Sequence, residues 1–264
     1  MDLFDSELRV IDAAQALAAK LGDDPNHTVA AAVMDTLGHI HTGVNVHHFT
    51  GGPCAELVAI GAAAAAHAGP LVTITAAGCD DRGLLAPCGR CRQVILDLHP
   101  DALIALPDEL GRTTSAMAEA AGTAGAAGTA RTASGSTYDI APITALLPRS
   151  YRHPDAEPTR LLRFNARYFD AIASARKTLT VRWNESHTAG PALAYFENTD
   201  SGTVPVEITS VEAHRLSELT PQILQLSKSP TSEGYVANLR EHYPAMPEDA
   251  NVEVVTFRLS APNI

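Results

Sequence analysis

Two short stretches of sequence decide the fold: Gly51-Gly52-Pro53-Cys54-Ala55-Glu56 and, further along, Pro87-Cys88-Gly89-Arg90-Cys91. In both, a proline comes directly before a cysteine, and helix-forming residues follow. We therefore predict that one helix begins near Cys54 and another near Cys88. The two-residue gap between Cys88 and Cys91 places both thiols on one helical turn, where they can face a single metal ion.

Cys54, Cys88 and Cys91 together predict a catalytic zinc site with one Zn²⁺ per chain. Three thiolates occupy three corners of the tetrahedron that zinc prefers and leave the fourth for water, whereas four protein ligands close a structural site. The positive ends of two helix dipoles would stabilise the thiolates. Glu56 lies two residues after Cys54, close enough to carry protons without binding the metal.

The alternative interpretation is that these cysteines are small core residues, because an isolated cysteine in an Ala-rich helix is more often buried than a ligand. The combination of three cysteines, Glu56 and two helix starts is more specific and favours metal binding. Cys79 fits no pattern and is predicted to be an ordinary buried or half-buried thiol.

The hydrophobic pattern around these stretches predicts alternating helices and strands. Apolar residues at helical spacing predict helices, and short β-branched runs predict strands. The expected order is helix, hairpin, helix, strand, helix, strand and a last short helix, at residues 6–21, 28–46, 54–67, 71–76, 88–98, 102–106 and 143–147. This order is typical of an α/β sandwich.

A length of 264 residues with 45% hydrophobic side chains predicts two domains. Residues 1–150 hold the cysteine patterns, residues 151–160 form a Pro-containing linker, and residues 161–264 have a β-rich composition. Residues 113–137 are almost wholly Ala, Gly, Ser and Thr, which bury little surface, so a flexible insert is expected there. In the second domain we predict a helix and three strands, over 163–172, 178–181, 204–211 and 252–259.

Charge and cysteine content exclude several classes of protein. The formal net charge is -11; residues 1–150 hold 8 basic and 16 acidic side chains, and the remainder hold 11 and 14. Neither half suits a polyanion, so nucleic acid is an unexpected partner. The sequence has no uninterrupted run of 18 apolar residues, so no membrane span is expected. The few cysteines argue against a disulfide framework and favour a reducing compartment, from which we expect a cytoplasmic protein.

The stretch from Ala175 to Arg182 alternates cationic or hydroxyl side chains with apolar ones. Basic residues beside hydroxyls on a strand could hold a phosphate or a pyrimidine carbonyl. The alternative, and the more common case, is a charged face in contact with solvent.

The sequence from Thr42 to Val58 and from Arg82 to Gln93 resembles the blasticidin-S deaminases of the cytidine deaminase family. The resemblance extends over nearly all of residues 1–151. It implies a three-layer α/β fold around a mixed sheet, a homotetramer, and hydrolytic removal of ammonia from C4 of a cytosine nucleoside, either cytidine or an antibiotic such as blasticidin S. It also implies substrate contacts at Thr28, Asn45, Ala55, Arg82 and Tyr151.

Two departures from the family pattern concern the substrate and the charge of the site. Ordinary cytidine deaminases have Asn-x-Glu before the zinc helix, where the carboxylate holds ribose hydroxyls; here Asn45 is kept, but His47 stands in place of the glutamate. A substrate with a modified sugar is therefore expected to be preferred over cytidine, unless His47 is only a surface imidazole. Many relatives also place an arginine after the catalytic glutamate. This chain has Leu57 there, and Arg90 is the expected replacement.

The stretch from Arg163 to Arg182 resembles the opening of an ASCH domain, a PUA-like β-barrel, and especially the small amidohydrolases that remove acetyl from N4-acetylcytidine. Shorter similarities follow at 233–235, 243–244 and 252–259. The resemblance implies that Lys177 activates a nucleophile, that Thr180 lies beside it, and that Glu233 is the catalytic acid.

Three functions remain open from the sequence. The first is a cytosine nucleoside deaminase whose second domain shapes the choice of substrate. The second is a bifunctional enzyme that removes an N4-acyl group and then deaminates. The third is a deaminase that an RNA-binding ASCH domain directs to its target, and the acidic charge balance counts against it.

Overall fold

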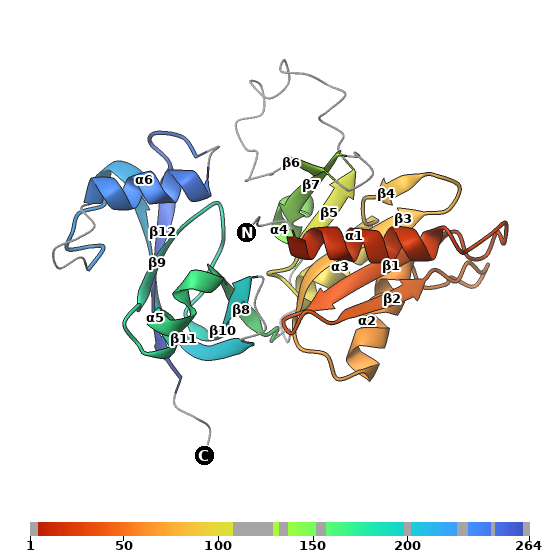
Figure 1. Ribbon diagram of the computed structural model, residues 1–264, viewed down its shortest axis with the longest axis horizontal. Helices are drawn as coiled ribbons and strands as arrows, with labels where there is room; N and C mark the ends of the chain where they lie inside the picture. Colours follow the sequence, from red (N-terminus) through yellow and green to blue (C-terminus); the bar gives the residue numbers. More distant parts are fainter. Residues whose placement is uncertain are drawn as a thin grey trace. The chain divides into compact units, whose positions relative to one another are not determined.

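The computed structural model describes residues 5–107, 129–131, 137–151, 157–197, 202–225, 232–243 and 246–260. The chain divides into two compact units (Figure 1). The first comprises Met1–Leu161 with Glu197–Gly202, and the second comprises Leu162–Phe196 with Thr203–Ile264. Most of the segment 113–137 and residues 152–156 of the predicted linker lie outside the described residues. No helix in the described parts is long and apolar enough to cross a membrane.

The first unit is built on one seven-stranded mixed sheet. Strands β3 and β5 run parallel, and the other pairs with a defined register are antiparallel, as the mixed sheet predicted from the sequence requires. The strands lie in the order β2 (Ile40–Val44), β1 (Val29–Asp35), β3 (Leu71–Gly78), β5 (Leu103–Pro107), β7 (Thr137–Pro142) and β6 (Thr129–Arg131), with β4 (Gly83–Leu85) paired to β3.

Helices cover both faces of this sheet, which makes three layers. Every residue of β3 is buried, and a strand buried along its whole length needs cover on each face. Helix α1 (Asp5–Ala18) packs on β1 and β3. Helices α2 (Ala55–Ala65), α3 (Gly89–Leu98) and α4 (Ile143–Leu146) share one apolar cluster with alternate residues of the strands. The predicted three-layer fold is confirmed.

Gly43 on β2 sets the distance between that strand and α2. A Cβ atom at Gly43 would lie 2.4 Å from the backbone nitrogen of Ala59 and 2.9 Å from the carbonyl oxygen of Ala55. Only glycine allows the first turn of α2 to approach the strand this closely. The position of the residues at the start of α2 therefore depends on the absence of a side chain on β2.

The second unit contains a five-stranded sheet that curls into a half-barrel (Figure 1). Its order is β8 (Arg160–Asn165), β10 (Gly190–Glu197), β11 (Thr203–Arg215), β12 (Asn251–Leu259) and β9 (Leu179–Trp183), so β8 and β9 are the edge strands. Four shorter elements complete the unit: η2 (Ala166–Tyr168), α5 (Phe169–Ala173), η3 (Leu216–Glu218) and α6 (Ser232–His242).

Two predictions about local structure are wrong in part. The expected helix over 163–172 begins as strand β8, and helical backbone starts only after Asn165, whose side-chain oxygen accepts a hydrogen bond from the Arg167 backbone N–H. The expected flexible insert contains strand β6, which pairs with β7. Backbone hydrogen bonds form a strand ladder without large side chains, so composition alone does not exclude it.

Candidate metal centre and substrate site

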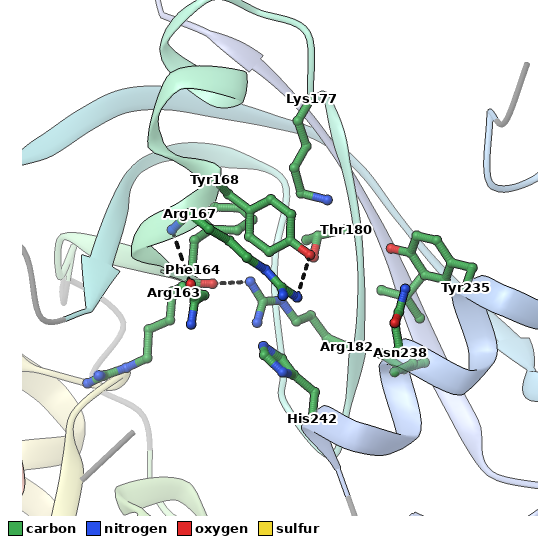
Figure 2. Close-up of a pocket in the computed structure, with 13 residues that line it drawn as sticks. Arg163, Phe164, Arg167, Tyr168, Lys177, Thr180, Arg182, Tyr235, Asn238 and His242 are labelled. Atoms are coloured by element: carbon green, nitrogen blue, oxygen red, sulfur yellow. Dashed lines mark hydrogen bonds between the residues drawn. The ribbon is translucent and has the colours of Figure 1, made fainter. Parts of the chain in front are cut away.

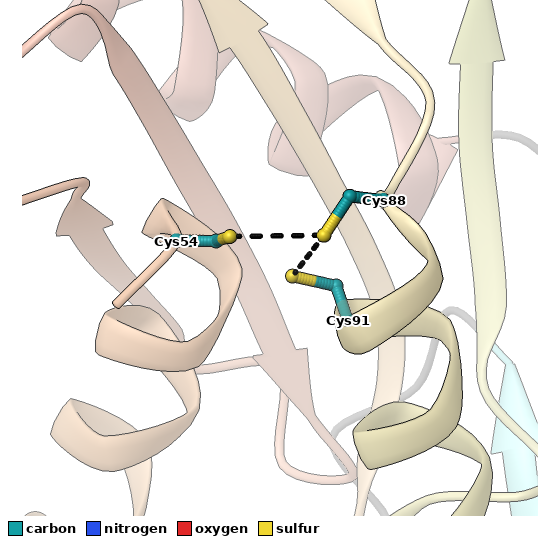
Figure 3. Close-up of side chains that lie close together, drawn as sticks. All are labelled: Cys54, Cys88 and Cys91. Carbon is teal, nitrogen blue, oxygen red and sulfur yellow. Dashed lines mark hydrogen bonds between the residues drawn. The ribbon is translucent and has the colours of Figure 1, made fainter. Parts of the chain in front are cut away.

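Three thiols converge between the first turns of α2 and α3 (Figure 3). The Sγ atoms of Cys54 and Cys88 are 3.7 Å apart, those of Cys88 and Cys91 are 3.6 Å apart, and all three lie within 4.8 Å of one another. A tetrahedral zinc ion with bonds of about 2.3 Å to sulfur separates its sulfur ligands by about 3.8 Å. The spacing and the donor set therefore fit a single Zn²⁺ ion.

The two helix starts aim these thiols inward. Cys54 and Cys88 are the N-cap residues of α2 and α3, both with extended backbone, and neither side chain caps its own helix. Cys91 lies one turn into α3 and is fully buried. Because the thiols are not used in capping, they remain available to a cation, and two positive helix ends face them.

Burial governs the protonation of the thiols. It raises the pKa of the Cys91 thiol far above the usual value, and the charge of Glu56 acts in the same direction. Burial also raises the pKa of Cys54. At Cys88, burial is outweighed by hydrogen bonds from the Cys91 backbone and from the other two thiols, so its pKa is lowered. Metal binding must therefore displace protons from at least two thiols at neutral pH.

Glu56 lies in the first turn of α2, only 6% exposed, beside the thiols. Its charge contributes to the raised pKa values of both Cys54 and Cys91. The cluster of ligand atoms that lie within 4.8 Å of one another consists of the three thiols alone. The carboxylate is thus held next to the centre and outside its coordination set.

Three of the predicted substrate contacts form one hydrogen-bonded cluster at the edge of the sheet. The Asn45 side-chain oxygen accepts hydrogen bonds from the backbone N–H groups of Thr28 (2.7 Å) and Val29 (2.8 Å). The Arg82 guanidinium donates to the Thr28 carbonyl oxygen and to the Cys79 carbonyl oxygen (3.2 Å). Asn45 and Arg82 therefore fix the loop before β1 from two sides.

The remaining predicted contacts lie nearer the helices. Ala55 is the first residue of α2 and is fully buried. Tyr151 is 67% exposed, and its carbonyl oxygen accepts a hydrogen bond of 2.9 Å from Gln93 on α3. The side chain of His47 is exposed. Arg90, also exposed, donates to the Gly52 carbonyl oxygen at 3.4 Å, across the gap between the two cysteine stretches.

Sequence reasoning missed Arg92. Its guanidinium donates to the carbonyl oxygen of Pro87 (2.7 Å), directly before Cys88, and to that of Leu146 (3.1 Å) at the end of α4. Arg92 therefore holds the start of α3 against α4 and positions the paired cysteines. The only sequence signal was its place directly after Cys91.

The predicted residues of the second unit fall into two places. Lys177 and Thr180 line one cavity of about 310 Å³ (Figure 2). Glu233, in the first turn of α6, lies in a different depression beside Leu216 and Glu248. The structure therefore brings Lys177 and Thr180 together and does not add Glu233 to them. Arg182 and Tyr235, which line the same cavity, lie in the resembling stretches 163–182 and 233–235 without a role assigned to them, whereas no sequence pattern pointed to His242 on α6.

The fold and the metal centre define the class of protein. An open three-thiolate site with a buried carboxylate beside it is the arrangement of a zinc-dependent hydrolytic enzyme. Residues 5–106 match the family described as the cytidine and deoxycytidylate deaminase zinc-binding region. The chain is 32% identical over 119 residues to the blasticidin-S deaminase of Bacillus cereus, covering 41% of this chain and 85% of that protein. The chain belongs to the cytidine deaminase family, and it is a zinc-dependent deaminase.

Two solved structures are similar to parts of the chain. The cytidine deaminase of Burkholderia pseudomallei is 26% identical and covers 54% of this chain and 97% of its own, with a TM-score of 0.39. An ASCH domain from Lactobacillus crispatus is 15% identical and covers 34% of this chain and 68% of its own, with a TM-score of 0.28.

Proposed function

We propose that the chain removes the exocyclic amino group from C4 of a cytosine nucleoside by hydrolysis, leaving the uracil form and ammonia. The observation that carries this proposal is the spacing of the Cys54, Cys88 and Cys91 sulfurs, which suits one open zinc site, with Glu56 buried beside it. Bound zinc would supply an activated water near neutral pH.

Glu56 is proposed as the group that moves protons. A carboxylate near the metal and outside its ligand set can accept a proton from the nucleophile and deliver it to the departing nitrogen. Its burial excludes bulk water, which would otherwise compete as a proton donor. The role requires that the carboxylate stay close to the thiols, and Glu56 lies in the first turn of α2, whose N-cap residue is Cys54.

The substrate contacts are proposed at Thr28, Asn45, Ala55, Arg82 and Tyr151. The Asn45 oxygen accepts two hydrogen bonds from the backbone, and one amide N–H donates to the Asn26 carbonyl oxygen at 3.4 Å. The second amide N–H is the proposed donor for a sugar hydroxyl. With His47 in place of a second carboxylate, we expect a substrate with a modified sugar, such as the blasticidin S on which the B. cereus relative acts, to be preferred over cytidine.

A panel of substrates tests the proposal. Zinc-loaded protein is incubated with cytidine, deoxycytidine, cytosine and blasticidin S, and ammonia release and a mass gain of about one unit are measured. Glu56→Gln protein that retains zinc is the control for background hydrolysis. Absence of ammonia from all four compounds would contradict the proposal. Cytidine as the best substrate of the panel would contradict only the role given to His47.

The bifunctional alternative, amide hydrolysis followed by deamination, has one supporting observation. Lys177 and Thr180 line one cavity, and burial, followed by the charges of Arg182 and Arg167, lowers the pKa of Lys177 to about 8. A partly neutral lysine can act as a base near neutral pH. Water would add to the acyl carbon, releasing acetate and the free 4-amino group, which the zinc site would then remove as ammonia.

N4-acetylcytidine distinguishes this alternative. Wild-type protein should yield acetate and uridine, Glu56→Gln should stop at cytidine, and Lys177→Ala should leave the starting compound intact, while Arg176→Ala serves as a charge-matched control. A Glu233→Gln variant should behave like wild type, because Glu233 lies outside the cavity. If wild-type protein releases no acetate, the second unit is not an amidohydrolase.

We further propose a cytoplasmic homotetramer. The four cysteines are all free thiols in the structure, which suits a reducing compartment. Phe49, five positions before Cys54, is 91% exposed, and such an exposed aromatic side chain suits a contact between subunits. Light scattering of the zinc-loaded protein tests the assembly, and a monomer at micromolar concentration would contradict it.

A further inference from the structure

The cavity of the second unit is lined by residues of β8, β9, η2 and α6 (Figure 2). Four basic side chains reach it: Arg167, Lys177, Arg182 and His242, which together we call the cationic pocket. Arg163 contributes its carbonyl oxygen, which accepts a hydrogen bond from Arg182, while its own guanidinium lies over the Tyr195 ring at 5.4 Å.

The charge of this pocket is one-sided. Among the described residues, no carboxylate lines it, although residues 151–264 contain more acidic than basic side chains. Glu185 lies 3.8 Å from Arg182 and offsets that one charge. No ion pair to Arg167 or Lys177 occurs in the part of the chain that the structure describes. The cations are therefore collected at one place in a unit that is acidic overall.

Aromatic rings and hydrogen bonds hold these cations in position. The Tyr168 ring lies 4.9 Å from the Arg167 guanidinium and 4.7 Å from the Lys177 ammonium group, and the Phe164 ring lies 5.0 Å from the Arg182 guanidinium. Arg167 also donates a hydrogen bond of 3.0 Å to the Tyr168 hydroxyl. The side chains are thus preorganised, and a ligand would lose little rotamer entropy in engaging them.

Keeping like charges together away from water costs free energy. The cost is visible at two groups: burial and then the Arg182 and Arg167 charges lower the pKa of Lys177 to about 8, and the same causes lower the pKa of His242. An anion in the pocket would offset the repulsion between these cations. Arginine guanidinium groups match the oxygen geometry of phosphate.

We infer that the cationic pocket binds a 5′-mononucleotide through its phosphate monoester. A volume of about 310 Å³ is at the lower end of the range for small-molecule sites and exceeds the needs of a bare anion. Tyr235 and Asn238 line the cavity from α6 and supply an aromatic ring and an amide suited to a base. A long polyanion is disfavoured because residues 151–264 are acidic overall.

Calorimetry with UMP tests this inference on the zinc-loaded full chain, because UMP carries the phosphate and has no amino group to lose. Binding of UMP, uridine, inorganic phosphate and an oligouridylate without terminal phosphates is compared in wild type, Arg167→Ala and Lys177→Ala. The matched control is Arg176→Ala, which removes an exposed cation next to Lys177 that does not line the pocket. Circular dichroism checks that each variant is folded.

The expected result is that UMP binds at least about tenfold more tightly than uridine, that each pocket variant loses at least about tenfold, and that Arg176→Ala is unchanged. Inorganic phosphate as tight as UMP would overturn the nucleotide assignment. Tighter binding of the oligouridylate would assign the pocket to RNA instead. UMP binding that is indifferent to Arg167 and Lys177 would place the ligand elsewhere and overturn the inference. None of these results depends on deamination, so they leave the proposed function of the first unit untouched.

Discussion

The metal centre of the first unit and the cationic pocket of the second unit are opposite solutions to burying charge. At the metal centre, three thiols lie close to Glu56, and a cation would neutralise the negative charge that they carry as thiolates. In the cationic pocket, three side chains of Lys and Arg collect positive charge around a cavity of about 310 Å³ that an anion would neutralise. In both places like charges lie closer together than a stable fold without a ligand requires.

The two sites also differ in how rigidly their groups are placed. The thiols come from two helix starts packed on a sheet whose strand β3 is buried along its whole length, so their spacing is fixed by the backbone. The cations of the pocket stand on long side chains that rings and hydrogen bonds steady. We therefore expect substitution of one zinc-binding thiol to abolish metal binding altogether. Substitution of one cation of the pocket should reduce ligand affinity only in part.

The largest effect is expected from removing a metal ligand. Cys88→Ala and Cys91→Ala should lose both zinc and deaminase activity, because two thiolates leave the ion underligated. Cys79→Ala removes a buried thiol that is not part of the centre and should keep both. Metal content by mass spectrometry, with one zinc per chain in wild type, measures this. Full zinc occupancy in the Cys88 or Cys91 variant would contradict the ligand assignment.

Glu56→Gln should separate chemistry from metal binding. The amide keeps the shape of the side chain and cannot accept a proton, so zinc should remain while kcat falls by a factor on the order of 10² to 10⁴. Asp12→Asn, an exposed carboxylate on α1, is the control and should leave kcat unchanged. Turnover close to wild type in Glu56→Gln would mean that another group moves the proton.

Gly43→Ala tests whether the backbone fixes the metal centre. The new Cβ would lie 2.4 Å from the Ala59 backbone nitrogen, so α2 must shift, at a cost of about 1 to 3 kcal/mol in unfolding free energy, with lower kcat. Gly61→Ala on α2 has open space around its Cβ and should stabilise the helix by about 0.5 to 1 kcal/mol. Chemical denaturation measures both. Equal stability of the two variants would show that the contact is not restrictive.

The smallest effect concerns the protonation of Lys177. With a pKa of about 8, half of its side chains are neutral at pH 8, against roughly one in 300 for a lysine of ordinary pKa. Its labelling by an amine reagent should therefore rise with a midpoint near pH 8, and bound UMP should move that midpoint upward. Mass spectrometry of the labelled peptides follows this, with the exposed Lys20 as control. A pH profile identical to that of Lys20 would contradict the electrostatic picture.

Each cysteine stretch could be interpreted as part of a metal site because the information within it is local. Cys88 and Cys91 lie on one helical turn, and Cys54 with Glu56 lies at another helix start, so the spacing in sequence already limits the spacing in space. The helices and strands around them were predicted for the same reason, since burial imposes a period on the sequence. Strand β4 is only three residues long, too short for a repeating hydrophobic pattern to be recognised in the sequence.

Lys177 and Thr180 were singled out by resemblance, but the pocket that they share needed the tertiary structure. Its walls are drawn from β8, η2, β9 and α6, and His242 is 65 positions from Lys177 in the sequence. No local period relates such residues, because the curl of the half-barrel and the packing of α6 bring them together. The same holds for Arg92, whose bond to Leu146 crosses from α3 to α4.

The mixed sheet was implied by the resemblance to the cytidine deaminase family. By itself the sequence predicted the zinc ligands, Glu56 beside them and two domains of different composition. These follow from side-chain chemistry and from periods set by backbone geometry, which act over a few residues. Only the tertiary structure decided that Glu233 lies apart from Lys177 and Thr180, and that Arg167, Arg182 and His242 face one cavity. Contacts between residues that are far apart in the sequence depend on how the strands and helices pack. A short stretch of sequence does not contain the distances between such residues.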